Sequence, residues 1–339
     1  MTDQTKQKFL DAMYKSDIAT AADEFRQVSN ASVFKNYYAT GFASLDRALG
    51  GGIPDGLTIV GALSGLGKTT IMMQIMNQLA DGLTPGIVFS LEMSRVELTA
   101  KEISRRTFIN TGGDLMLSRT ARDLMSRDVV MNLSAEAWDV VEEAKAQMGF
   151  GAKLTIVEQQ SKPITAENIC TYVRNWMTFN PGEKPVVLVD YLQILEPEDP
   201  KTPDIQAINH SLKLLHTLAK DLGIAIIAIS AINRAGYDEP IDRKAFKGSG
   251  GIEYSADVLI GMELHGVGGG CIVEREMASD VRAVDLVILK NRFGGVNQRI
   301  EFRFYTPFNH FDCLTRDEEK PGKGTPDFPY TERVLNLAH

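Results

Sequence analysis

The stretch Gly61-Ala62-Leu63-Ser64-Gly65-Leu66-Gly67-Lys68-Thr69-Thr70 joins one apolar run, Leu57–Val60, to another, Ile71–Met76. The first run predicts a buried strand, and the second has the spacing of a helix. A glycine-rich turn in this context directs several backbone N–H groups at one point, and the helix N-terminus adds a positive dipole end. The sequence therefore predicts a phosphate-binding loop, in which Ala62 takes the place of the usual first glycine.

The side chains of this loop indicate which groups of a nucleotide it would hold. Lys68 can reach the β- and γ-phosphates, and the Thr69 hydroxyl can ligate Mg²⁺. The competing interpretation is a glycine-rich turn with an incidental lysine, which would require both flanking patterns to be accidental. The other residues expected to contribute to binding ATP are Ser64, Gly65, Gly67 and Thr70.

Composition limits the class of protein. The chain has 339 residues, enough for one large α/β domain with appendages, and a net charge of −8. This charge argues against a generally basic nucleic-acid-binding surface but allows a local basic groove. The three cysteines lack metal-ligand spacing, which suggests reduced thiols in a cytoplasmic protein. No signal region or membrane-length apolar run is evident, so we expect no membrane association.

Two carboxylates follow predicted buried strands. Glu92 comes directly after the run Gly86–Leu91, and Asp190 after the run Pro185–Val189. At the carboxyl edge of a parallel sheet, Glu92 could activate a water near the γ-phosphate, and Asp190 could hold Mg²⁺ directly or through water. Alternatively, Glu92 is only a favourable charge at the start of a helix that begins near Ser94.

The remaining patterns complete an α/β arrangement. The run Ile224–Ser230 is so apolar that we expect it in the centre of a parallel sheet. Lys290 and Arg292 occupy alternate positions at a strand end, so their side chains should point the same way. A further basic cluster is predicted to be a solvated helix face; it consists of Lys101, Arg105 and Arg106.

Three segments are expected along the chain. Residues 1–39 have apolar positions such as Phe9 and Met13 at helical spacing, which predicts a helical arm and a linker. This arm could pack on its own domain or dock on a neighbouring subunit. Residues 40–315 form the predicted ATPase domain, and residues 316–339 a tail that is partly ordered at best.

The order of these motifs resembles the C-terminal ATPase domain of the DnaB family of hexameric replicative helicases, over about residues 40–312. The resemblance implies a RecA-like fold: a twisted, mostly parallel sheet with helices on both faces and a C-terminal β-hairpin. Phe89–Met93 resembles the family motif with the catalytic glutamate, and Asp190–Gln193 resembles the motif linked to Mg²⁺. Ser249–Asp257 is similar to the family's glycine-serine loop and the acidic strand start after it. Lys290–Gly294 is similar to its Lys-x-Arg-x-Gly element.

The resemblance also implies a function. A chain of this type would hydrolyse ATP with Mg²⁺ at the interfaces of a hexameric ring, act on single-stranded DNA, and meet a replication partner or loader. Lys290 and Arg292 would reach the γ-phosphate held by a neighbour. The loop Arg243–Gly251 is the candidate DNA contact through Lys244, Lys247 and Gly250, although a solvated charged loop is an equally plain interpretation.

The sequence departs from the family pattern in two respects. The family has a glutamine after the strand that ends in Ser230, where this chain has Ala231, and its helical N-terminal domain is absent from these residues, as in a short form. An alternative function is therefore a nucleotide-dependent binding or loading module that assembles with ATP but does not unwind DNA. A RecA- or KaiC-like recombination or signalling ATPase is a third possibility.

Overall fold

The computed structural model describes residues 36–149, 153–161, 163–232, 239–246 and 249–314. Apart from Asn36, these residues fall in one compact unit that begins at Tyr37. The predicted C-terminal tail and almost all of the predicted arm lie outside the described residues, so those two predictions are not tested.

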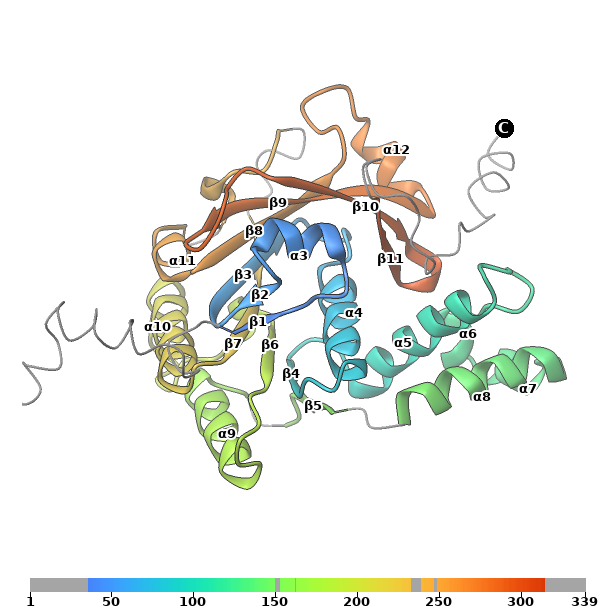
Figure 1. The fold of residues 1–339 in the computed structure, drawn as a ribbon, viewed down its shortest axis with the longest axis horizontal. Helices are drawn as coiled ribbons and strands as arrows, with labels where there is room; N and C mark the ends of the chain where they lie inside the picture. The colour runs from blue at the N-terminus through green and yellow to red at the C-terminus, as the bar shows by residue number, and fades with distance from the viewer. Residues whose placement is uncertain (1–35, 150–152, 162, 233–238, 247–248, 315–339) are drawn as a thin grey trace, which may run out of the picture. The chain divides into compact units, whose positions relative to one another are not determined.

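The helices and strands follow one another in an alternating order (Figure 1). The strands are β1 (Tyr37–Tyr38), β2 (Ile53–Pro54), β3 (Gly56–Ala62), β4 (Gly86–Ser90), β5 (Leu154–Glu158), β6 (Val186–Asp190), β7 (Ala225–Ala231), β8 (Val258–Leu264), β9 (Val281–Asn291), β10 (Arg299–Tyr305) and β11 (His310–Cys313). The α-helices are α3 (Ala43–Leu49), α4 (Lys68–Asp81), α5 (Arg95–Asn110), α6 (Ala121–Met125), α7 (Arg127–Met131), α8 (Ala135–Gly149), α9 (Ala166–Phe179), α10 (Asp204–Leu222), α11 (Ser249–Ser255) and α12 (Val273–Ala278). The 3₁₀ turns are η1 (Leu192–Ile194), η2 (Arg243–Ala245) and η3 (Thr306–Phe308).

Most of the described strands join one twisted sheet. Its order is β11-β10-β9-β8-β3-β7-β6-β4-β5, and the strands from β8 to β5 are parallel. The last three strands, β9 to β11, continue the sheet as antiparallel hairpins. The predicted architecture is therefore confirmed, including the central place of β7 and the C-terminal hairpin.

Successive residues of a strand point to opposite faces of the sheet, and helices cover both faces. Val60 packs in a core with Leu45 of α3 and Ile71 of α4. Its neighbour Ile59 packs in a second core with Leu215 of α10, on the other face. This two-sided burial explains why the central strands are almost continuously apolar rather than alternating.

Helix ends and connections have local causes. After Asp190 the strand ends and the chain turns into η1. Helix α3 begins after Phe42 and has no side-chain cap. The glycine-rich segment after β8 leads into the short helix α12. Thr165 caps α9, since its hydroxyl accepts from the Asn168 N–H.

The last strand is fastened to the first long helix. The Gln74 amide on α4 donates to the Phe311 carbonyl at 2.9 Å and accepts from the Phe311 N–H at 2.8 Å. Gln74 is buried, and Phe311 also stacks on Phe304 of β10 with ring centroids 4.1 Å apart. A single side chain thus satisfies both backbone groups of a residue in an edge strand.

Helices α5–α8 form a group beside α4 (Figure 1), and an ion cluster on α5 joins that helix to the end of α4. Arg105 and Arg106 both donate to Glu102, at 2.6 Å from the nearest oxygen, and Arg106 also pairs with Asp81 of α4 at 2.8 Å. The prediction of a solvated face is therefore wrong for these arginines, which are at most 9% exposed. Residues around α5 cover this face, and the acid three and four positions earlier compensates both charges.

We expect Glu102→Ala to lower the free energy of unfolding by about 3–5 kcal/mol, because it leaves two buried guanidinium groups without their shared carboxylate. Glu142→Ala is the matched control: its pair with Lys145 has the same spacing, but both side chains are nearly half exposed. That control should cost about 1 kcal/mol or less. Urea unfolding of both variants makes the comparison, and equal losses would contradict the structural role assigned to Glu102.

Candidate functional site

Glycines shape the turn between β3 and α4. Gly65 and Gly67 have φ angles of 84° and 87°, in the left-handed region that other residues rarely adopt. A Cβ at Gly67 would also lie only 2.8 Å from the ring of Phe304. Helix α4 begins at the next residue, Lys68, so the unpaired N–H groups of its first turn lie at the loop. The backbone thus has the form that an anion-binding loop requires.

Lys68 lies folded against this loop. Its ammonium group donates to the carbonyls of Ala62 and Leu63, at 2.9 and 3.1 Å. Burial lowers the pKa of Lys68, while the carboxylates of Asp190 and Glu92 act in the opposite direction. The lysine is therefore held by weak acceptors that phosphate oxygens could replace.

The loop is joined to β6 by one hydrogen bond. Thr69 Oγ1 donates to Asp190 Oδ2 at 2.8 Å, and Asp190 is only 3% exposed. Burial raises the pKa of Asp190, and the bond from Thr69 opposes that rise. A hydroxyl and a carboxylate this close together could serve as two oxygen ligands, which Mg²⁺ uses together with phosphates and water.

Glu92 stands next to this pair because of strand register. Ser90 at the end of β4 lies opposite Asp190, and the Leu91 N–H donates to the Asp190 carbonyl at 2.9 Å. Glu92 follows immediately and is exposed. Two carboxylates from adjacent strands therefore reach the same edge of the sheet.

All predicted loop residues line one cleft together with both carboxylates. The cleft has a volume of about 800 Å³, and its predicted members are Ser64, Gly65, Gly67, Lys68, Thr69, Thr70, Glu92 and Asp190. Within the described ranges no group of three or more His, Cys, Asp or Glu side chains could hold a metal by itself. A metal here would accordingly need phosphate or water oxygens beside Thr69 and Asp190.

Sequence reasoning missed Lys101, which also lines this cleft. Burial lowers the pKa of Lys101, and the carboxylates of Asp190, Glu97 and Glu92 oppose this. A signal was available: Ser94 caps α5 through a capping box with Glu97, and Lys101 follows that cap by two helical turns. The same face of the helix therefore carries the cap and this cation, so the prediction of a solvated face is wrong for Lys101 as well.

The other end of the cleft comes from the C-terminal hairpins. Phe304, Thr306 and Asn309 line it, with Arg282 of β9. The Arg282 guanidinium donates to the Gly65 carbonyl at 2.7 Å. An aromatic ring with polar neighbours suits the nucleoside part of a nucleotide better than its phosphates.

Ala231 lines the cleft where the family pattern has glutamine. Its N–H donates to Gln193 Oε1 at 3.0 Å, and Gln193 Nε2 donates to Ser230 Oγ at 2.9 Å. A side-chain amide is therefore present at this strand end, but it comes from η1 and is engaged with the backbone of β7.

Lys290 and Arg292 do not join the cleft of their own chain. The Lys290 ammonium donates to the Glu253 carbonyl at 2.6 Å, and Arg292 Nη1 lies 2.9 Å from Asp257 Oδ1. The structure thus separates these two cations from the phosphate-binding loop, and their predicted role stays a prediction.

The candidate DNA loop is only partly described. Lys244 is exposed in η2, where Asp242 caps the turn by accepting from the N–H groups of Lys244 and Ala245. Gly250 lies in the backbone of α11, and Lys247 lies outside the described residues.

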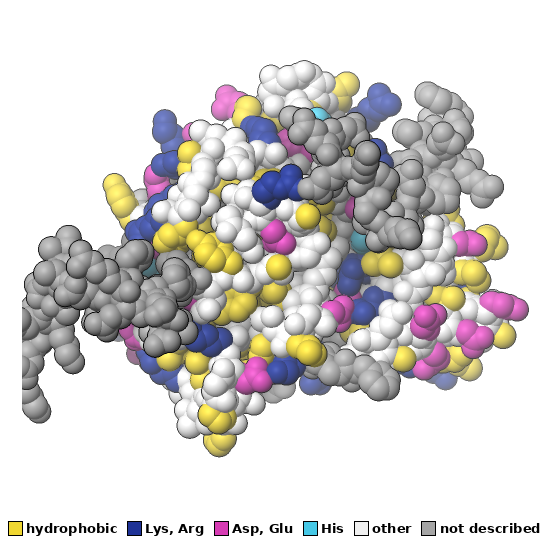
Figure 2. Space-filling view, viewed as in Figure 1, with side chains coloured by type: hydrophobic (Ala, Val, Ile, Leu, Met, Phe, Trp, Pro, Cys, Tyr) yellow, Lys and Arg dark blue, Asp and Glu magenta, His cyan; other side chains and the backbone are white. Residues whose placement is uncertain are grey.

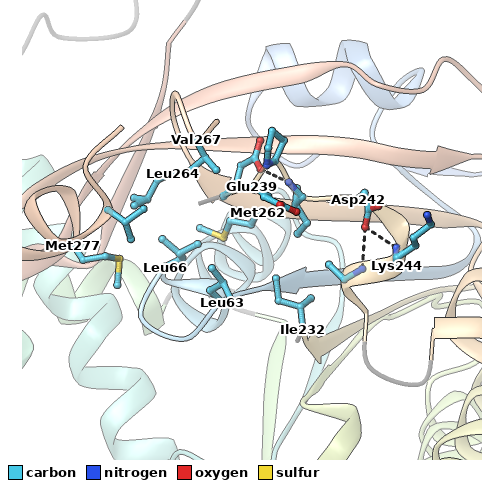
Figure 3. A pocket seen from close by; sticks show the side chains of 15 residues that line it. Leu63, Leu66, Ile232, Glu239, Asp242, Lys244, Met262, Leu264, Val267 and Met277 are labelled. Carbon is cyan, nitrogen blue, oxygen red and sulfur yellow. Dashed lines mark hydrogen bonds between the residues drawn. The ribbon is translucent and has the colours of Figure 1, made fainter. Parts of the chain in front are cut away.

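A second cavity, of about 450 Å³, lies behind the loop (Figure 3). Leu63 and Leu66 of the loop face Met262 and Leu264 of β8 and Met277 of α12 across it. Apolar side chains are joined in its walls by three carboxylates and Lys244, so negative charge prevails there and disfavours a phosphate group. In the part of the chain that the structure describes, no helix has the length and apolar character needed to cross a membrane.

Known proteins share this arrangement. The family described as DnaB-like helicase C terminal domain matches residues 38–313. The replicative DNA helicase DnaB of Haemophilus influenzae is 27% identical over 288 residues, which cover 83% of this chain and 56% of that protein. The chain therefore spans about half the length of this curated relative.

Solved structures agree on the fold. One of them, the structure of an ATPase domain, has a TM-score of 0.73 at 20% identity, covering 88% of this chain and 99% of that one. A DnaB-like replicative helicase, studied with its interactions with primase, has a TM-score of 0.71 at 21% identity, covering 89% and 67%. These likenesses and the sheet order confirm the predicted RecA-like fold. Because the family match extends over most of its length, the chain belongs to the DnaB-like helicase C-terminal domain family.

Proposed function

We propose that this chain is an ATP-hydrolysing motor of the DnaB type that acts on single-stranded DNA. The hydrogen bond from Thr69 to Asp190 best supports the ATP-hydrolysing part, because it joins the phosphate-binding loop to the acidic end of β6 within one cleft. The match to the DnaB-like helicase family supports the action on DNA. The relatives named as replicative helicases are longer than the segment that matches this chain. The activity of the whole relative is therefore only proposed for this chain.

In this proposal each group in the cleft has a role in hydrolysis. The loop N–H groups and Lys68 would bind the phosphates, Thr69 and Asp190 would hold Mg²⁺, and Glu92 would orient the attacking water. When bound, Mg²⁺ would neutralise negative charge on the nucleotide. Lys101 adds a cation on the Glu92 side of the cleft.

An alternative function is a nucleotide-dependent loading module that does not unwind DNA. Ala231 favours it, because a methyl group forms no hydrogen bond to a γ-phosphate and so cannot report its presence. Gln193, the nearby amide, is occupied by the backbone of β7. Both functions require ATP binding and differ in whether DNA changes the rate of hydrolysis and whether strands separate.

Glu92→Gln should bind ATP but lose about 10²- to 10⁴-fold in turnover, because the water loses its base. Lys68→Ala should weaken ATP binding itself. Both are measured with a fluorescent ATP analogue and a phosphate-release assay, with and without single-stranded DNA, beside a strand-displacement assay. Normal turnover in Glu92→Gln would remove the assignment of Glu92. DNA-independent hydrolysis without strand displacement would favour the loading module.

The candidate DNA loop, Arg243–Gly251, is tested in the same assays. In the proposal, Lys244 and Lys247 contact DNA phosphates, since a motor that moves along any sequence depends on backbone contacts. The double change of these lysines to alanine should keep the DNA-independent rate and lose the stimulation by DNA. If stimulation persists, the loop does not bind DNA.

We further propose that the active form is a ring, of six subunits by the family pattern, with Lys290 and Arg292 acting on a neighbour's nucleotide. Both cations lie away from their own loop, and the Arg292 side chain is 47% exposed. An arginine supplied by a second subunit suits phosphoryl transfer because its charge is permanent and its planar donors match phosphate oxygens.

Arg292→Ala should lower turnover by about 10³-fold or more, since charge that develops in the transition state is no longer neutralised. Mixing it with Lys68→Ala subunits should restore part of the activity, because each hybrid interface can combine an intact loop with an intact arginine. Phosphate release is measured at several mixing ratios, with light scattering to verify assembly. Undiminished turnover of Arg292→Ala in an assembled ring would refute the assignment.

An apolar groove between α5 and α8 offers a site for assembly. Val96, Met125 and Trp138 line it and are 65%, 52% and 41% exposed. Figure 2 shows hydrophobic side chains among acidic ones over the α6–α8 region. We propose residues 3–28 of a neighbouring copy as the occupant, because their apolar positions have the helical spacing that such a groove accepts.

Deletion of residues 1–35 should therefore raise the protein concentration needed for ring assembly about tenfold or more, without lowering the melting temperature of the domain. Trp138→Glu should have the same effect from the groove side. Phe179→Glu is the control, since Phe179 is 83% exposed at the end of α9, away from the groove. Light scattering against concentration compares the variants. Assembly that is indifferent to both the deletion and Trp138→Glu would exclude this docking.

A further inference from the structure

We infer that Asp257 is the residue that positions Arg292 for a neighbouring subunit's nucleotide. The inference rests on the proposed function, because it assigns a role to Asp257 only if Arg292 acts between subunits. Asp257 lies just before β8 and is 5% exposed, whereas the arginine lies just after β9 and reaches the surface.

Arg292 is held at two points of the same residue. Its backbone N–H donates to the Asp257 carbonyl at 3.0 Å, and Nη1 of its side chain donates to Asp257 Oδ1 at 2.9 Å. Fixing both ends of a long side chain removes much of its rotamer freedom before any phosphate arrives. The contact with Asp257 uses one terminal nitrogen, so further N–H donors of the half-exposed guanidinium can serve another partner.

Asp257 itself is fixed from the other side. Its Oδ2 accepts from the Leu57 N–H at 2.9 Å, and its own N–H donates to the Leu57 carbonyl at 2.8 Å. Oδ2 also lies 3.4 Å from His216 Nε2 of α10. A Cβ at Gly56 would collide with Oδ2, so the glycine lets the backbone of β3 approach the carboxylate closely. The beginning of β3, the strand that leads to the phosphate-binding loop, thus holds the Asp257 carboxylate in place.

The two oxygens of the Asp257 carboxylate therefore contact two functional elements that lie far apart in the sequence. Oδ2 is bound to the beginning of β3, whose other end carries the subunit's own ATP site, and Oδ1 is bound to the arginine offered to the next site. Lys290 has a different support, since its ammonium group binds the Glu253 carbonyl of α11. Loss of the Asp257 charge should consequently affect Arg292 without releasing Lys290.

The test is Asp257→Asn in the full chain. Asparagine keeps the volume and an oxygen acceptor for the Leu57 N–H but removes the charge that orients the guanidinium. We expect a loss in kcat of about 10- to 100-fold with little change in KM for ATP, as for a misplaced reacting group. The double variant with Arg292→Ala should be no slower than Arg292→Ala alone, because both changes remove the same contribution.

Subunit mixing separates this role from a structural one. If Asp257 positions Arg292, Lys68→Ala subunits should restore turnover to Asp257→Asn subunits, since they supply an intact arginine to an intact loop. If Asp257 instead supports its own loop through Leu57, mixing restores nothing and the inference is overturned. Unchanged kcat in Asp257→Asn would overturn it equally.

Asp285→Asn is the matched control. Asp285 is 3% exposed and pairs with Arg299 and His265, away from Arg292, so any activity it loses should not return on mixing. If Asp257→Asn fails to assemble by light scattering, Asp257→Glu keeps the charge but displaces it, and should lose kcat and recover in the same mixing experiment. A normal rate in Arg292→Ala would refute the proposed action between subunits. A normal rate in Asp257→Asn alone would refute only the positioning role.

Discussion

Strand β3 is hydrogen-bonded to a parallel neighbour on each side, and all of its residues are buried. The parallel arrangement brings the carboxyl ends of β3, β4 and β6 to one edge of the sheet. The phosphate-binding loop, Glu92 and Asp190 all lie at that edge, although more than a hundred residues separate the loop from Asp190 in the sequence. A displacement of β3 along its neighbours would separate Thr69 from Asp190, so the candidate site depends on this register.

The parts of the fold and site that could be predicted from the sequence are those encoded locally. The buried strands are nearly continuous apolar runs, and the loop requires glycines at positions with positive φ, so both leave a pattern in neighbouring residues. Glu92 and Asp190 were predictable because each ends such a run. Bringing them together required only the assumption of parallel strands, which the sheet order confirms.

The features that sequence reasoning missed depend on what packs against a residue. Lys101 and Arg106 belong to one basic helix, but one lines the cleft and the other pairs with Glu102 and Asp81. A run of charges does not reveal which side of a helix the rest of the chain covers. The support of Arg292 by Asp257 is likewise invisible in sequence, because it joins the beginning of one strand to the end of the next.

The contact between Gln74 and Phe311 has a consequence for association between chains. Strand β11 lies at the margin of the described sheet, where exposed N–H and C=O groups would ordinarily invite another strand to add itself. At Phe311 both groups are already taken by the Gln74 amide. A foreign strand would have to displace a buried side chain of the helix that begins at the phosphate-binding loop. At this position the margin is thereby protected against accidental β-sheet extension.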